Sequence, residues 1–137
     1  MLSVFIFSSY FSFGQDKPEL VLPIGNIKQN YAEFSPNGQM VLTSAEDKTV
    51  KLWNTHTGKL LHSFYHNSPI VIAHFSPDGE KVASISISGE IYVHNISTGE
   101  MLYKNDHIVF EPVDIIFSSN SKKIIIYSDF KIVILKV

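Results

Sequence analysis

A five-residue segment of this chain occurs twice at a fixed separation. Phe34-Ser35-Pro36-Asn37-Gly38 returns 41 residues later as Phe75-Ser76-Pro77-Asp78-Gly79. Thr57-Gly58 and Thr98-Gly99 lie the same 41 residues apart, and a weaker third copy begins at Phe117. A period of about 40–45 residues is typical of four-stranded propeller blades, provided that the repeated unit consists of strands.

The repeated unit does have the pattern of strands. Short runs rich in β-branched and aromatic residues alternate with turns of Gly, Pro, Asn and Asp, and no amphipathic helix is evident. We therefore predict an all-β chain of antiparallel four-stranded blades, about three in number, that form an incomplete ring. The expected strands are 31–34, 40–45, 50–54 and 59–64, then 70–75, 81–86, 90–95 and 100–104, then 113–117, 122–128 and 131–137.

These strands divide one domain, residues 15–137, into blades at about 29–66, 67–107 and 108–137. A lone strand, 19–24, is expected ahead of the first blade. Counting it, the chain has twelve strands, whereas propellers usually have roughly four to eight whole blades. Either the sequence is the N-terminal piece of a longer protein, or, if it is full length, two chains form a six-blade homodimer in which each lone strand completes the partner's third blade.

The first fourteen residues differ in kind from the rest. Met1–Gly14 contains no charged side chain and is too short to span a bilayer. Ser12 and Gly14 place small residues at positions −3 and −1 of a cleavage site before Gln15, although no basic residue precedes the apolar run. We expect a signal peptide at 1–14 and export to the periplasm or the exterior. A buried or frayed N-terminal strand, or a mis-assigned start, is the alternative, and would leave the protein cytoplasmic.

One segment carries a family resemblance. Asp47–Asn54 reads Asp-Lys-Thr-Val-Lys-Leu-Trp-Asn, with a Phe-Ser-Pro-Asn-Gly turn before it and Thr57-Gly58 after it. This arrangement resembles a blade of the WD-repeat (WD40) β-propeller family, and the resemblance extends over about 20–137. With the N-terminal segment and the Lys-, Ile- and Asn-rich composition, the chain resembles exported WD-repeat proteins of bacteria. The resemblance implies a rigid, non-catalytic scaffold that binds protein partners.

Family members brace each blade with hydrogen bonds among a His before the first strand, a Ser or Thr on the second, an Asp in the next turn and a Trp on the third. By this resemblance the bracing residues here are Thr43, Asp47, Trp53, His66, Ser84, His107 and Asp129. Gly25-Asn26 stands where the first blade should have its His, and Ser88 and His94 replace the Asp and the Trp of the second. A buried Asp47 would therefore need another donor, because an unpaired buried charge is costly.

Composition argues against several function classes. All eleven cationic residues are Lys, the net charge is −2 and no basic stripe is present, so we expect no nucleic-acid binding. The absence of Cys excludes disulfides, thiolate metal sites and a Cys nucleophile from this chain. No segment is long and apolar enough for a membrane span.

No motif for catalysis, metal or cofactor binding stands out. His62 and His66 have a spacing that suits a metal on a helix, but on a strand they lie roughly 13 Å apart and cannot share an ion. We therefore predict no catalytic, metal or cofactor site. One alternative is the propeller portion of a larger exported hydrolase, caspase-like or a serine peptidase, because Glu90–Val93 after its Ser-Pro-Asp-Gly turn also resembles propellers that gate such peptidases. Assembly of the ring is a third possible role.

Overall fold

Residues 21–106 and 111–137 are described by the structure, a computed structural model. Over these ranges the chain forms three antiparallel sheets. The first contains β1 (Gln29–Phe34), β2 (Met40–Ala45), β3 (Thr49–Asn54) and β4 (Leu60–Tyr65); the second contains β5 (Ile70–Phe75), β6 (Lys81–Ser86), β7 (Ile91–Asn95) and β8 (Met101–Asn105); the third contains β9 (Pro112–Phe117), β10 (Lys123–Ser128) and β11 (Ile132–Lys136). The predicted all-β blades are confirmed, and each strand lies within two residues of its expected bounds.

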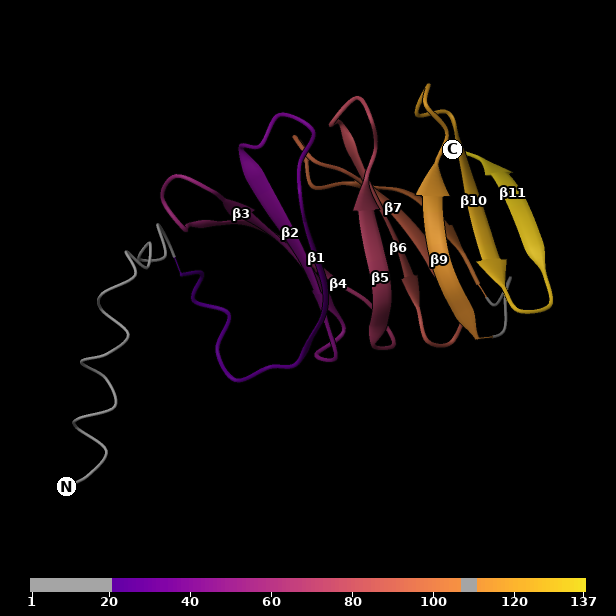
Figure 1. Ribbon diagram of the computed structural model, residues 1–137, viewed down its shortest axis with the longest axis horizontal. Helices are drawn as coiled ribbons and strands as arrows, with labels where there is room; N and C mark the ends of the chain where they lie inside the picture. Colours follow the sequence, from indigo (N-terminus) through magenta and orange to yellow (C-terminus); the bar gives the residue numbers. More distant parts are fainter. Residues whose placement is uncertain (1–20, 107–110) are drawn as a thin grey trace, which may run out of the picture.

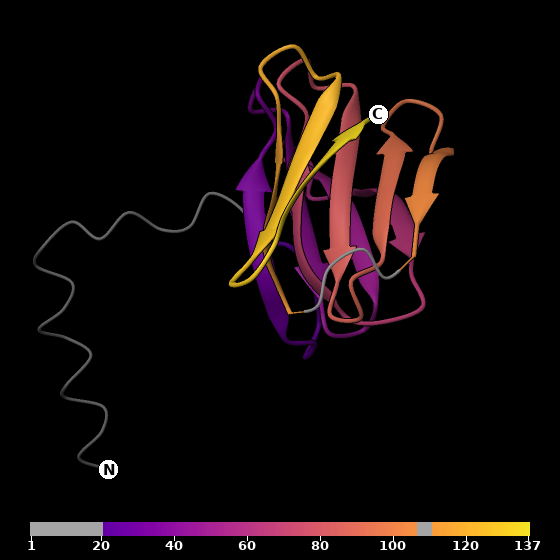
Figure 2. The same ribbon diagram turned by 90° about the vertical axis from the view of Figure 1, so that its right-hand side faces the viewer.

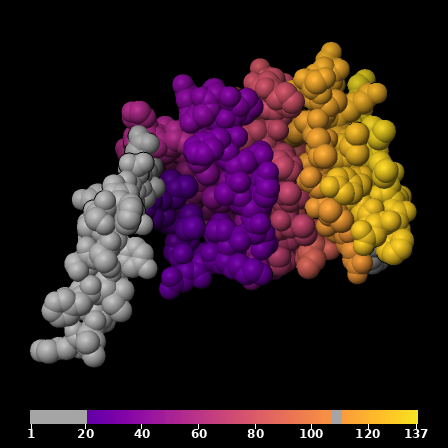
Figure 3. Space-filling view, in the orientation of Figure 1, coloured from indigo at the N-terminus to yellow at the C-terminus, as the bar shows by residue number. Residues whose placement is uncertain are grey.

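The sheets stand side by side in chain order (Figure 1). Within each sheet the strands follow the order of the sequence, so every connection is a hairpin. The first strands of the sheets are neighbours, since β5 contacts both β1 and β9. The described atoms form one continuous surface from the first sheet to the third (Figure 3). Each sheet therefore behaves as a blade that packs against the next one.

Two apolar clusters hold the blades together. The first is formed between the first two sheets by Leu42, Val50, Leu52, Phe64, Ile70, Ala73, Phe75, Val82 and Ile96. The second is formed between the second and third sheets by Ala83, Ile85, Ile91, Val93, Ile115, Phe117, Ile124 and Ile126. Side chains alternate between the faces of a strand, so the second blade packs one face against the first blade and the other against the third.

The repeated Ser-Pro-Asp-Gly segment forms the turn between the first and second strands of a blade. Gly38 and Gly79 have φ of 71° and 74°, and Ser121 takes the same place in the third blade with φ of 57°. A left-handed conformation is costly for a serine. Ser121 is buried, and its hydroxyl accepts a hydrogen bond from the Asp78 amide at 3.2 Å. This hydrogen bond therefore joins the turn of the third blade to the equivalent turn of the second blade.

The expected lone strand is not formed over its described part. Val21–Ile24 pairs with no sheet, and Val21 is exposed. A strand needs an edge on which to hydrogen-bond, whereas this segment closes a tight turn on itself through the Ile24 amide and the Leu22 carbonyl. The rest of that strand and the signal peptide predicted at 1–14 lie outside the described residues. No membrane-spanning helix occurs among the residues described.

Candidate functional site

In the first blade, two of the residues expected to brace it are in direct contact. The indole Nε1–H of Trp53 on β3 donates a hydrogen bond to Thr43 Oγ1 on β2 at 3.0 Å. Both side chains are almost fully buried. A buried indole N–H needs a partner, and the hydroxyl of the neighbouring strand provides it. The pair joins the second and third strands of the blade.

Asp47, in the turn between β2 and β3, does have another set of donors. The Thr49 amide and Lys51 Nζ donate to its two oxygens at 3.1 and 3.0 Å, and the Thr49 hydroxyl donates as well. Burial alone would raise the pKa of Asp47, but the hydrogen bonds from Thr49 and Lys51 lower it. The carboxylate is therefore satisfied locally, without the His that the family pattern places there.

In the second blade, His66 connects two blades. Its Nδ1–H donates to the carbonyl of Lys48, in a turn of the first blade, at 3.2 Å. Its Nε2 then accepts from the Ser84 hydroxyl on β6 at 3.0 Å. This pattern requires a neutral imidazole. Burial lowers the pKa of His66 to about 4, so the ring stays neutral at ordinary pH.

His94 takes the place of the tryptophan but not its hydrogen bond. Its ring stacks on Phe64 with centroids 4.3 Å apart and meets His66 edge-on at 5.7 Å. Burial, together with the neighbouring His66, lowers the pKa of His94 to about 4. The residue acts here as a neutral aromatic spacer between the first and second blades.

Sequence reasoning missed the acid that organises the second blade. Glu90 is almost fully buried and accepts hydrogen bonds from Asn67 at 3.0 Å, Ser88 at 2.9 Å and Ser68 at 3.1 Å. Burial alone would raise its pKa, but these donors lower it to about 2. The repeat contained a signal for this acid. Glu90 stands 41 residues after Thr49, and it follows by two residues the Ser88 that replaces the Asp of the first blade.

The third blade gives less to compare. Asp129 is exposed in the turn between β10 and β11, and His107 lies outside the described residues. Their role in bracing stays a prediction. The ring of Phe64, which lies between the two histidines in sequence, stacks on His62. The described ranges contain no group of three His, Cys, Asp or Glu residues that could hold a metal ion.

A second polar group, unforeseen from the sequence, joins all three blades at their first strands. His74 on β5 bonds Glu33 of β1 through Nδ1 and Asp114 of β9 through Nε2, each at 2.9 Å. The Phe75 amide and the Tyr31 hydroxyl also donate to Glu33. We call Glu33, His74 and Asp114 the inner triad. All three are partly exposed.

Both ring nitrogens of His74 face carboxylate oxygens, an arrangement that favours the charged imidazole. A ring that donates from both nitrogens to carboxylates carries both protons. Burial alone would lower the pKa of His74, but the hydrogen bonds and charges of Glu33 and Asp114 raise it. Burial would likewise raise the pKa of Glu33, yet bonds from His74 and the Phe75 amide lower it. With His74 protonated, the triad has two negative charges and one positive charge.

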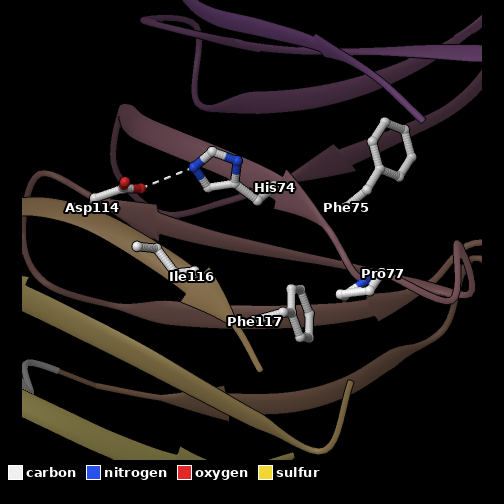
Figure 4. A pocket seen from close by; sticks show the side chains of 6 residues that line it. All are labelled: His74, Phe75, Pro77, Asp114, Ile116 and Phe117. Atoms are coloured by element: carbon white, nitrogen blue, oxygen red, sulfur yellow. Dashed lines mark hydrogen bonds and ion pairs between the residues drawn. The ribbon is translucent and has the colours of Figure 1, made fainter. Parts of the chain in front are cut away.

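A pocket of about 380 Å³ opens beside the inner triad (Figure 4). His74 and Asp114 form its polar end. Phe75 and Pro77 stand at the other end, and Ile116 and Phe117 of β9 run along one side (Figure 4). The first strands of two blades therefore frame one concave site with an acidic and an apolar part.

Comparisons with known proteins agree with this fold. Residues 27–54 match the family model "WD domain, G-beta repeat", and no curated protein matches the chain. Two solved structures, "Crystal structure of RRP9 WD40 repeats" and "Structure of U3-55K", superpose with a TM-score of 0.78 at 18% identity over 86% of this chain. Residues 27–54 thus match a WD repeat, and the described part of the chain has the fold of the β-propeller blades in these two structures.

The chain spans 38% of the length of each of these two structures. At this identity the likeness shows the fold alone. Neither description names a hydrolase, so the catalytic alternative finds no support in the comparisons.

Proposed function

We propose that this chain is a non-catalytic scaffold that binds other proteins. Three blades packed through continuous apolar clusters supply a rigid frame. The buried His66 and the buried acid Glu90 are occupied by partners within the blades, which leaves them as structural groups. Scaffolds of this kind bind through the surfaces that their blades leave uncovered.

The observation that carries the proposal is the contrast among three equivalent phenylalanines. Phe75 and Phe117 are 8% and 9% exposed because the preceding blade covers them, whereas Phe34 is 68% exposed. Strand register places Phe34 on one face of the first sheet with Val41 and Trp53. The first blade therefore leaves Phe34 exposed on the face that the other two blades bury, although Trp53 on the same face is itself buried.

The third blade presents the opposite kind of face. Ile116, Ile125 and Ile134 lie in one cross-strand row and are all exposed. Figure 2 is the view toward this sheet, with β10 and β11 in front of the other strands. Within the chain, a face of this type always receives the phenylalanine-bearing face of the next blade. A second copy of the chain offers such a face, so, for a chain that is full length, we propose a homodimer closed by two contacts of this kind.

Sedimentation velocity tests the dimer. Phe34→Ser and Ile125→Ser each impair one of the two faces, and each should raise the dimer dissociation constant at least tenfold. An equimolar mixture of the two variants keeps one unaltered pair of faces, so association should partly return. Phe130→Ser is the matched control, because Phe130 is 91% exposed in a turn rather than in the isoleucine row. A wild-type chain that stays monomeric at every concentration would contradict the proposal.

We also propose that the protein is exported. The support is the uncharged apolar run Met1–Gly14 with small residues before Gln15. Mass spectrometry of protein recovered outside the cytoplasm should give an N-terminus at Gln15. Recovery of the chain only in the cytoplasm, with Met1–Gly14 still attached, would argue against export.

A further inference from the structure

The pocket beside the inner triad combines an acidic end with an apolar wall. Ile116 is partly exposed beside it, and Pro77 and Phe117 extend the apolar surface away from Asp114. A volume of about 380 Å³ lies at the small end of the range for ligand sites. The pocket thus suits one long side chain better than a large cofactor.

The hydrogen bonds at the acidic end leave one oxygen available. Asp114 Oδ1 accepts from His74 Nε2 at 2.9 Å and from the Ile115 amide at 2.7 Å. Its Oδ2 receives no hydrogen bond from any residue in the described ranges, and Figure 4 shows this carboxylate at the end of the pocket. Both oxygens of Glu33 are already occupied. The free acceptor of the inner triad is therefore Asp114 Oδ2.

The charge of the inner triad also selects the ligand. Glu33 and Asp114 carry two negative charges against the single positive charge of His74, and no Lys lines the pocket. An anion would meet repulsion there, and a purely apolar group would leave Asp114 Oδ2 without a donor. A metal ion would find only one free carboxylate oxygen, fewer ligands than such ions take.

We propose that this pocket receives a basic side chain, arginine or lysine, from a bound protein. The cationic head donates to Asp114 Oδ2, and the aliphatic stem lies on Ile116 and Phe117. The inference rests on the scaffold function, since a partner protein supplies the side chain. It does not require the dimer.

Nuclear magnetic resonance with a small probe tests the pocket directly. N-acetyl-arginine amide, added to the ¹⁵N-labelled chain, should shift the Ile115–Phe117 amides and the His74 ring saturably. N-acetyl-norleucine amide, which has a comparable stem without the charge, should bind at least fivefold more weakly. Asp114→Asn should weaken arginine binding about tenfold, the factor that corresponds to 1.4 kcal/mol.

Two further variants distinguish a specific bond to Asp114 from a general attraction between the probe and the negative charge of the protein. Glu100→Gln removes one negative charge from an exposed turn of the second blade and should leave arginine binding unchanged. Glu33→Gln alters the partner of His74 but leaves Asp114 Oδ2 in place, so it should weaken binding by less than Asp114→Asn does. Chain stability is followed by circular dichroism, so that an unfolded variant is recognised.

Equal binding of the two probes, or unchanged arginine binding in a folded Asp114→Asn variant, would overturn the proposal. So would shifts spread over the whole surface without saturation. Ile116 belongs both to the pocket and to the isoleucine row, but the two positions changed in the sedimentation experiment, Phe34 and Ile125, do not line the pocket. Failure of the pocket and failure of the dimer are therefore separate outcomes.

Discussion

The first and second blades have the same strand order and turns but are braced by different side chains. Trp53 donates to Thr43 within the first blade. In the second, the equivalent serine is Ser84, and it bonds His66, which also reaches the turn of the first blade. The first blade thus secures itself, while the second is secured partly to its neighbour.

The acid has also moved between the two blades. In the first blade Asp47 precedes Thr49 by two residues, and in the second Ser88 precedes Glu90 in the same way. Acid and hydroxyl have exchanged places, yet each carboxylate still receives its hydrogen bonds. What the fold maintains is the pairing of buried polar atoms, and the residue that supplies each atom can change.

The largest expected effect comes from emptying the aromatic site of the first blade. Trp53→Ala should lower the free energy of unfolding by about 3–5 kcal/mol, because it removes a buried aromatic ring. Trp53→Phe keeps most of the ring and loses only the bond to Thr43, at a cost of about 1 kcal/mol. Urea unfolding followed by circular dichroism measures both, and equal losses would show that packing is unimportant here.

The two acids should differ in the same assay. Glu90→Ala should cost about 2–3 kcal/mol, because a buried charged acceptor that receives three side-chain hydrogen bonds is lost. Asp47→Ala should cost about 1 kcal/mol, since Asp47 is partly exposed and water can replace it. Fluorescence of Trp53, the single tryptophan, reports the unfolding of both variants. A larger loss of unfolding free energy for Asp47→Ala than for Glu90→Ala would contradict the proposed difference between the two acids.

Moving the acid of the second blade from position 90 to position 88, where the first blade has its Asp, tests whether the two positions act together. Glu90→Thr removes the acid of the second blade, and Ser88→Asp alone places a second carboxylate beside Glu90. The double variant recreates the Asp-x-Thr of the first blade and should recover about 1–2 kcal/mol relative to the sum of the single changes. A double-mutant cycle gives this coupling energy directly. If the two losses in the free energy of unfolding are strictly additive, the residues at positions 88 and 90 are not energetically coupled.

The last difference between the histidines of the blades is a pH dependence of the melting temperature. His66 and His94 have folded-state pKa values of about 4, below the ordinary 6.5, so their stabilising contribution is lost as pH falls from 6.5 to 4. The raised pKa of His74 acts in the opposite sense, because its contribution is complete below pH 6.5 and is lost as pH rises through the folded-state value.

We therefore expect a maximum near neutral pH, with the larger loss on the acid side, where two pKa values are lowered. His94→Phe should reduce the loss on the acid side while keeping a ring against Phe64. His74→Gln should flatten the alkaline side. A melting temperature that keeps rising above pH 7 in the wild-type chain would exclude a stabilising charged His74.

The repeat was sufficient to predict the blades but not the contacts among them. A period of 41 residues, with turns at fixed places, determines where strands begin and end. The inner triad could not be derived in this way, because Glu33, His74 and Asp114 come from three different blades and meet only when those blades pack. The step of 41 residues between Glu33 and His74 was the available hint, though it does not reveal that Asp114 completes the group.

Glu90 was missed for a different reason. The family pattern places the acid two residues earlier, so Ser88 appeared to be a loss rather than half of an exchange. The lone strand at 19–24 was expected from its apolar residues, but apolar residues form a strand only when they pair with a sheet edge, and Val21–Ile24 pairs with none.

Because each sheet contacts only the sheets next to it, the described chain is a short linear array with nearest-neighbour coupling. The middle sheet belongs to two interfaces and each outer sheet to one. Amide hydrogens of β6 and β7 should then exchange with solvent more slowly than those of β2, β3 or β10. A change in the middle sheet affects both interfaces between the sheets, whereas an outer blade can open while the other two remain folded.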